Sequence, residues 1–209
     1  MDGLLVDTEP LWFETEGEVM ARLGGAPWTK EDQEALLGGS MDNTVGYLLA
    51  KATRPASPAD VARWMTDGML KRATEGRVTV RPGVRALLAE VAAAGIPHAL
   101  VTGSQRPFTE AVLTSTGFRF PVVVTGDDVT RTKPDPEPYL LAAKLLDADP
   151  QQCVALEDSP NGVTSATAAG CHVVAVPTLV PIPPAPRRLV TPSLAGITLK
   201  TLQSLAADS

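Results

Sequence analysis

Four short polar stretches of this 209-residue chain combine side chains that can bind a divalent cation and a phosphate group. They are Asp2 with Asp7, Thr102-Gly103-Ser104, Lys133, and Glu157-Asp158. Mg²⁺ prefers carboxylate oxygens, and it usually takes one or two protein carboxylates together with waters and phosphate oxygens. Hydroxyl and backbone N–H groups on a small turn bind phosphate oxygens, and a lysine neutralises the remaining charge. These residue types therefore indicate phosphoryl-transfer chemistry.

Each stretch also has a purely structural interpretation. Asp158, Thr102 and Ser104 each precede a predicted helix, so they suit the role of helix caps. Lys133, next to Pro134, suits a solvated loop. Capping does not exclude the functional interpretation, because the N-terminus of a helix also binds phosphate.

The predicted elements place these stretches along one edge of a sheet. Beyond residue 78, short apolar strands alternate with amphipathic helices. Strands are predicted at residues 96–101, 122–124, 153–156 and 172–176, and helices at 84–94, 107–116, 136–146, 161–169 and 199–206. This alternation predicts a Rossmann-like α/β fold, in which helices cover both faces of a parallel sheet. Open α/β sheets bind ligands at the carboxyl ends of their strands, where most of the polar stretches lie.

A block near the start of the chain has a different character. Its apolar residues follow helical spacing in four segments, at residues 10–24, 32–37, 42–50 and 58–70, and no strand is predicted among them. We therefore expect an α/β core formed by residues 1–11 and 78–209, interrupted by an all-helical insert at residues 12–77.

Composition excludes several classes of function. The net charge of −6 and the lack of a basic run argue against a nucleic-acid or anionic-membrane surface. No apolar stretch reaches the roughly 18 residues that span a bilayer, and the acidic start is unlike a signal peptide. We expect a cytoplasmic protein that binds neither nucleic acid nor membrane.

Four ordered motifs resemble those of the haloacid dehalogenase-like hydrolase superfamily. They are Asp2-Gly3-Leu4-Leu5-Val6-Asp7-Thr8-Glu9, Val101-Thr102-Gly103-Ser104, Lys133-Pro134-Asp135-Pro136-Glu137-Pro138-Tyr139 and Glu157-Asp158-Ser159-Pro160-Asn161-Gly162. The resemblance covers nearly the whole chain. Within this superfamily, the chain most resembles the branch that has a helical cap inserted after the first motif. That branch includes β-phosphoglucomutase and small sugar-phosphate phosphatases.

The resemblance implies a role for each motif. The implied roles are catalysis by Asp2 and Lys133, phosphate binding by Thr102, Gly103, Ser104 and Lys133, and Mg²⁺ binding by Asp2, Glu157 and Asp158. Asp2 would be the general acid and base, and it would bind Mg²⁺ through its backbone carbonyl. Glu157 would be either a second acidic ligand or a partner of the ligands. The implied mechanism passes through a phosphoaspartyl intermediate, which water activated by Asp2 then hydrolyses.

The chain departs from the family pattern at its first motif. The nucleophilic aspartate would lie two positions before Asp2, upstream of Met1. The apolar strand that carries it is missing as well, and a sheet without its central strand exposes two edges. We therefore expect the natural chain to begin further upstream, with a truncated and inactive product as the alternative.

The helical cap is expected to select the substrate. Its candidate substrate residues, each of which also suits a packing role, are Trp12, Ser40, Met41 and Asn43. β-Phosphoglucomutases carry a histidine and an arginine at the places that align with Trp12 and Met41, so a phosphatase is favoured over a mutase.

The resemblance thus implies a Mg²⁺-dependent phosphatase of a small phosphorylated metabolite, a sugar phosphate, in a monomer or weak homodimer. Two alternatives remain. One is a β-phosphoglucomutase-like phosphosugar mutase, and the other is a non-catalytic phosphometabolite-binding protein, if the nucleophile is truly absent.

Overall fold

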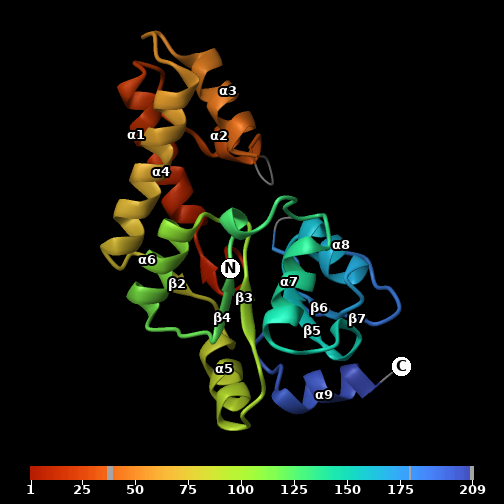
Figure 1. Ribbon diagram of the computed structural model, residues 1–209. Coiled ribbons are helices and arrows are strands. Elements are labelled where there is room, and N and C mark those ends of the chain that lie inside the picture. Colours follow the sequence, from red (N-terminus) through yellow and green to blue (C-terminus); the bar gives the residue numbers. More distant parts are fainter. Residues whose placement is uncertain (37–39, 179, 208–209) are drawn as a thin grey trace. The chain divides into compact units, whose positions relative to one another are not determined.

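The structure is a computed structural model, which describes residues 1–36, 40–178 and 180–207 (Figure 1). Its chain divides into two compact units. One unit is Thr8–Val78, and the other combines Met1–Asp7 with Thr79–Ser209. The chain crosses between the units next to β1 (Val6–Asp7) and β2 (Thr79–Val80), which pair antiparallel.

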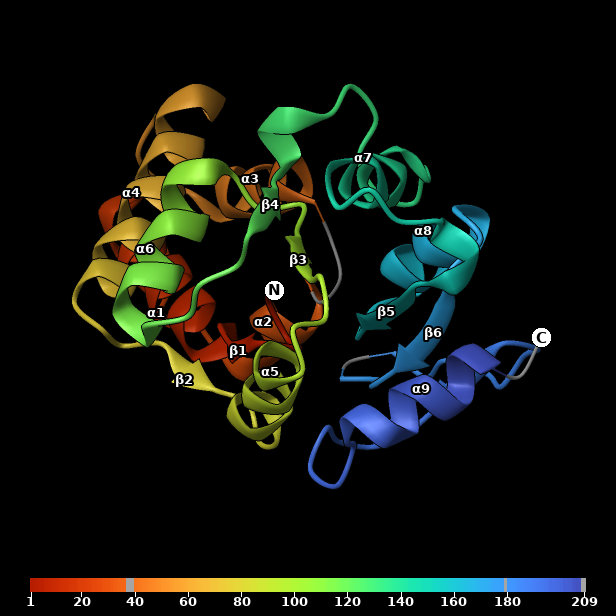
Figure 2. The ribbon, with the colours of Figure 1, turned by 60° about the horizontal axis from the view of Figure 1, so that its bottom comes forward.

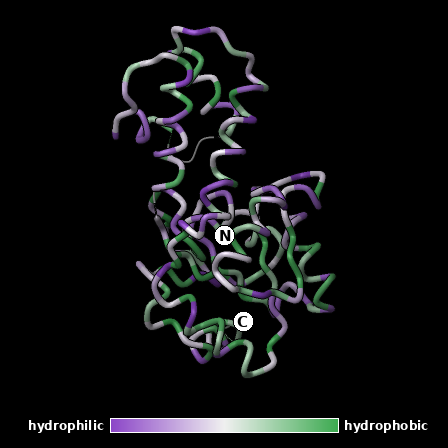
Figure 3. The backbone as a smooth tube through the Cα atoms, turned by 90° about the vertical axis from the view of Figure 1, so that its left-hand side faces the viewer, coloured by the Kyte–Doolittle hydropathy of each residue, from purple (hydrophilic) through white to green (hydrophobic). Residues whose placement is uncertain are grey.

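The first unit contains helices as its regular elements over the residues described, as the sequence predicts. They are α1 (Glu9–Arg22), α2 (Lys30–Glu34), α3 (Met41–Lys51) and α4 (Pro58–Thr74). Serine hydroxyls cap the N-termini of α3 and α4. Ser40 accepts a hydrogen bond from the N–H of Asn43, and Ser57 accepts one from the N–H of Asp60. Hydrophobic and hydrophilic residues alternate along the longer helices of this unit (Figure 3). α1, α3 and α4 each bury apolar residues, whereas α2 consists of polar and charged residues. The buried apolar residues form a core of Val19, Met20, Leu23, Val45, Leu48, Val61 and Met65.

The second unit alternates strands and helices. Its strands beyond β2 are β3 (Ala99–Val101), β4 (Val122–Val124), β5 (Val154–Glu157), β6 (His172–Ala175) and β7 (Arg188–Val190). Its α-helices are α5 (Val84–Ala93), α6 (Arg106–Thr116), α7 (Glu137–Leu145), α8 (Pro160–Ala168) and α9 (Leu199–Ala207). Two short 3₁₀ helices, Gly126–Asp128 and Pro150–Gln152, complete it.

Strands β3 to β7 pair in parallel, as predicted, but they lie in separate sheets. β3 pairs with β4, while β6 pairs with β5 on one side and with β7 on the other. β7 was not predicted, because its three residues include Arg188 and all are only half-buried, so they form no apolar run. The antiparallel pair of β1 and β2 was not predicted either, since each strand has only two residues.

Helices cover β5 and β6 on two sides. Figure 2 shows α7 and α8 on one side of these strands and α9 on the other. All four residues of β6 are buried, which is typical of a parallel strand covered on both faces. Its residues Val173 and Ala175 belong to a core that α7 and α8 complete through Tyr139, Val163 and Ala166. Among the described residues, none of the helices has the length and apolar character needed to cross a membrane.

Candidate active site

Asp2 lies beside the turn that follows β3. The hydroxyl of Ser104 donates a hydrogen bond of 2.7 Å to Oδ2 of Asp2. The other carboxylate oxygen, Oδ1, is buried and has no hydrogen-bond partner among the described residues. Burying a carboxylate oxygen without a partner is costly, so Oδ1 is suited to a ligand that brings a donor or positive charge.

Asp158 meets the residue that follows Asp2. Gly3 has a φ of +71°, and a Cβ added to it would lie 2.1 Å from Oδ2 of Asp158. This close approach requires glycine. The first and last of the four motifs therefore meet, although their sequences are far apart.

Thr102, Gly103 and Ser104 form a compact turn at the carboxyl end of β3. The N–H of Ser104 donates to Oγ1 of Thr102 at 3.1 Å, and the N–H of Thr102 donates to the carbonyl of Val124 at 2.9 Å. Thr102 is buried, whereas a Cβ added to Gly103 would meet no atom within 4 Å. The turn is thus fixed by hydrogen bonds and has open space beside Gly103, as a phosphate-binding turn needs.

Lys133 is held by three acceptors. Its Nζ donates to the carbonyl of Val101 at 3.1 Å, to the hydroxyl of Tyr139 at 3.4 Å and to Oε1 of Glu157 at 2.5 Å. The hydroxyl of Tyr139 donates to the same Oε1 of Glu157. Burial, followed by the charge of Glu157, raises the pKa of Tyr139 well above its usual value, so this hydroxyl keeps its proton. Lys133 therefore lies at the carboxyl end of β3 with its charge paired.

Asp158 is half-buried, and its carboxylate receives a hydrogen bond from a residue after β6. Oγ1 of Thr178 donates to its Oδ2 at 3.1 Å. Burial is the main cause that raises the pKa of Asp158. The positive charge of the amino group of Met1 opposes this shift, the charge of Glu157 adds to it, and the hydrogen bond from Thr178 also opposes it. A carboxylate desolvated in this way is stabilised by a nearby cation.

These observations test whether the acidic residues fit Mg²⁺. The buried, unpartnered oxygen of Asp2 and the desolvated carboxylate of Asp158 both suit a cation. The carboxylate of Glu157, in contrast, is already paired with Lys133 and Tyr139, which favours its alternative role as a partner over that of a direct ligand. Over the described residues, no group of three or more His, Cys, Asp or Glu side chains is arranged to hold a metal ion. Mg²⁺ usually takes only one or two protein carboxylates besides waters and phosphate oxygens, so the desolvated carboxylate of Asp158 fits such an ion.

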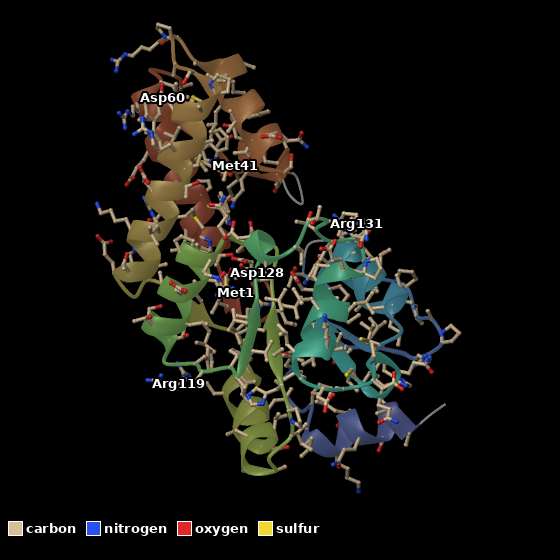
Figure 4. All side chains as sticks on the ribbon, viewed as in Figure 1. Met1, Met41, Asp60, Arg119, Asp128 and Arg131 are labelled. Carbon is tan, nitrogen blue, oxygen red and sulfur yellow. The ribbon has the colours of Figure 1, made fainter. Side chains whose placement is uncertain are left out.

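The four candidate substrate residues of the cap all have roles inside the helical unit. Trp12 and Met41 pack against its core, and Figure 4 labels Met41 at the start of α3. Ser40 caps α3 through the N–H of Asn43, and both of these residues are exposed. Gly38 and Gly39, which precede them, lie outside the described residues.

Sequence reasoning missed two residues of this site. Thr178 comes two residues after the predicted strand at 172–176, so the rule that ligands bind at the carboxyl ends of strands was enough to find it. Tyr139 lies inside the third motif, but its bond to Glu157 joins residues that are 18 positions apart and is not visible in the spacing.

Comparison with known proteins adds a family match. A family model described as haloacid dehalogenase-like hydrolase matches residues 1–176. Hexitol phosphatase A of Escherichia coli (strain K12) is 40% identical over 179 residues, which are 84% of this chain and 80% of that protein. A phosphorylated carbohydrates phosphatase of Thermotoga maritima is 36% identical over 173 residues, 81% of this chain and 79% of its own length.

A solved structure is similar over almost the full length. The crystal structure of CbbY from Rhodobacter sphaeroides, in complex with phosphate, has a TM-score of 0.82 to this chain. It is 32% identical in sequence, and the similarity covers 97% of this chain and 96% of that one.

Proposed function

The chain belongs to the haloacid dehalogenase-like hydrolase family, and from this premise we propose that it is a Mg²⁺-dependent phosphatase of a small sugar or sugar-alcohol phosphate. The family match confirms the resemblance seen in the motifs, and the similar structures confirm the α/β fold. The family and its named phosphatases also support the predicted enzyme class, a phosphoric monoester hydrolase.

The observation that carries the proposal is the convergence of Asp2, Ser104 and Asp158. Asp2 accepts a hydrogen bond from Ser104, and Gly3 next to it touches the carboxylate of Asp158. Lys133 adds a positive charge at the end of the same strand that positions Ser104. Acid, hydroxyl and cation at one sheet edge are what phosphoryl transfer requires.

The proposed reaction has two steps that share one general acid and base. By the family resemblance, a carboxylate two positions before Asp2, at a position outside residues 1–209, would attack phosphorus and break the bond to the ester oxygen. Asp2 gives its proton to the departing alcohol oxygen. Asp2 then takes a proton from water, which attacks the phosphoaspartyl group and releases phosphate. Thr102, Gly103 and Lys133 hold the phosphoryl oxygens throughout.

The carboxylate of Asp158 and the backbone carbonyl of Asp2 are the groups that would hold Mg²⁺, with Glu157 as a partner of Lys133. Bound Mg²⁺ supplies positive charge that polarises the phosphoryl oxygens. The helical unit is proposed to act as the cap that selects the substrate. Trp12 and Met41 offer no charged side chain to hold a second phosphate, which favours a phosphatase over a mutase.

Phosphate release tests this function. A chain that includes the position two residues before Asp2 is incubated with hexitol phosphates, aldose phosphates and p-nitrophenyl phosphate, in Mg²⁺ or in EDTA. The proposal predicts release that EDTA abolishes, with a hexitol or sugar phosphate cleaved faster than the nitrophenyl ester. A chain that binds these phosphates with Mg²⁺ but releases none would be a phosphometabolite-binding protein, and the phosphatase proposal would fail.

A further inference from the structure

We propose that Tyr139 and Gly162 are positioning residues, which hold the carboxylate of Glu157 so that it fixes the ammonium of Lys133 at the end of β3. The proposal rests on the proposed function, because it gives a catalytic purpose to the place of Lys133. It concerns residues that the four motifs do not by themselves assign to any task.

Tyr139 clamps Glu157 from α7. Its hydroxyl donates to Oε1 of Glu157, the oxygen that also accepts from Lys133. The ring packs in the core of the α/β unit, and the Nζ of Lys133 lies 4.9 Å from the ring centre. A tyrosine has few rotatable bonds, so a hydroxyl on a buried ring is a rigid donor. Glu157 is therefore oriented by a group that does not itself move.

Gly162 leaves the space that the second carboxylate oxygen of Glu157, Oε2, occupies. A Cβ added to Gly162 would lie 1.9 Å from Oε2 and 2.1 Å from Cδ of Glu157. Gly162 lies in the first turn of α8, where its N–H donates to the hydroxyl of Ser159 at 3.1 Å. The carboxylate thus rests against a position that only glycine leaves open. Tyr139 and Gly162 restrain it on its two oxygens.

The positioned carboxylate of Glu157 in turn fixes the ammonium of Lys133. A lysine ammonium has three N–H donors, and this one has three acceptors in Glu157, Val101 and Tyr139. The contact with Tyr139 is the longest at 3.4 Å, so it is the one that a phosphate oxygen replaces. Glu157 and Val101 keep the ammonium in place while this exchange occurs.

The kinetic test compares Tyr139→Phe, Lys133→Ala and the double variant with p-nitrophenyl phosphate and Mg²⁺. Tyr139→Phe keeps the packed ring and removes the hydroxyl. It is expected to lower kcat roughly tenfold with KM changed less than twofold, because loss of orientation acts on the transition state. In the Lys133→Ala background the same change is expected to cost less than twofold, since there is no ammonium left to position.

Tyr47→Phe is the matched control. The hydroxyl of Tyr47 also donates to a carboxylate, that of Asp32, but within the helical unit. Its kcat is expected to equal that of the unchanged chain. The proposal is overturned if Tyr139→Phe leaves kcat unchanged, or if it lowers kcat equally with and without Lys133.

A second readout does not need turnover. The exchange of the Lys133 ammonium protons with water is measured by NMR of the side-chain nitrogen. Tyr139→Phe and Gly162→Ala are each expected to speed this exchange at least tenfold, and Tyr47→Phe to leave it unchanged. Unchanged exchange in both variants overturns the positioning role. Faster exchange in a chain without phosphatase activity supports the positioning role, while the proposed function alone fails.

Discussion

The hydroxyl of Ser104 and the carboxylate of Asp2 are joined by a hydrogen bond of 2.7 Å across 102 positions of the sequence. Ser104 donates to Oδ2, while Oδ1 of Asp2 is buried and has no hydrogen-bond partner among residues 1–36, 40–178 and 180–207. The orientation of the proposed general acid and base therefore depends on one side chain.

Replacing Ser104 with alanine removes that donor. We expect kcat for phosphate release to fall about tenfold, because Asp2 loses its orientation, while the free energy of unfolding changes by only about 1 kcal/mol. Ser104→Thr keeps the hydroxyl and is expected to retain most of the activity. Equal rates for Ser104→Ala and the unchanged chain would show that this bond has no catalytic part.

The strands that form the edge of this site were easier to predict from the sequence than the side-chain contacts within the site. β4 begins and ends where predicted, at Val122–Val124, because an apolar run between polar turns is a local signal. The pairing of Lys133 with Glu157 depends on the distance between a loop and the end of β5, and spacing along the chain does not contain it. β7 was missed for a different reason, because its three residues are half-buried and form no apolar run. Thr178 follows a predicted strand, and the sequence could have placed it at this edge although not in contact with Asp158.

The contact of Thr178 with Asp158 predicts a change in metal affinity. Thr178→Val keeps the shape of the side chain and removes its hydroxyl, so Asp158 loses the donor that orients Oδ2. Outer partners of metal ligands typically contribute roughly 10- to 100-fold to affinity. We expect Mg²⁺ binding, measured by calorimetry, to weaken about tenfold, whereas Thr178→Ser should bind nearly as the unchanged chain does. Unaltered affinity in Thr178→Val would contradict this role.

Gly3→Ala is predicted to weaken Mg²⁺ binding far more than Gly117→Ala does. Gly3 and Gly117 have similar left-handed φ angles of +71° and +75°, so alanine costs roughly 1 kcal/mol of backbone strain at either position. An added Cβ meets Oδ2 of Asp158 at 2.1 Å from Gly3 but meets nothing within 4 Å from Gly117. We expect only Gly3→Ala to lose Mg²⁺ binding. Thermal unfolding of both variants distinguishes the backbone strain that they share from the steric clash with Asp158, which only Gly3→Ala has.

Glu16 makes the stability of the helical unit depend on pH. It is buried, and desolvation raises its pKa from 4.5 to about 7, with the hydrogen bond from Trp28 opposing the shift. Since the folded chain keeps this proton while the unfolded chain loses it, stability falls as pH rises from about 4.5 to about 7 and then stays lower. The shift corresponds to a few kcal/mol at most, at about 1.4 kcal/mol for each pH unit.

Glu16→Gln removes this titration. Urea unfolding between pH 5 and pH 8 is expected to show a smaller loss of stability with rising pH than in the unchanged chain. Glu34→Gln, at the end of α2, is the control for loss of one negative charge and should follow the unchanged chain. A Glu16→Gln variant with the original pH dependence would place the titration on another group.

The central claim is that Asp158 takes part in a metal-dependent phosphatase site, and the most direct measurement is phosphate release from a hexitol phosphate against Mg²⁺ concentration. The unchanged chain and the control Asp147→Asn are predicted to release phosphate with the same saturation by Mg²⁺. Asp158→Asn is predicted to stay folded by circular dichroism and to lose at least 100-fold in rate. Release by folded Asp158→Asn at the original rate and Mg²⁺ concentration would contradict the account.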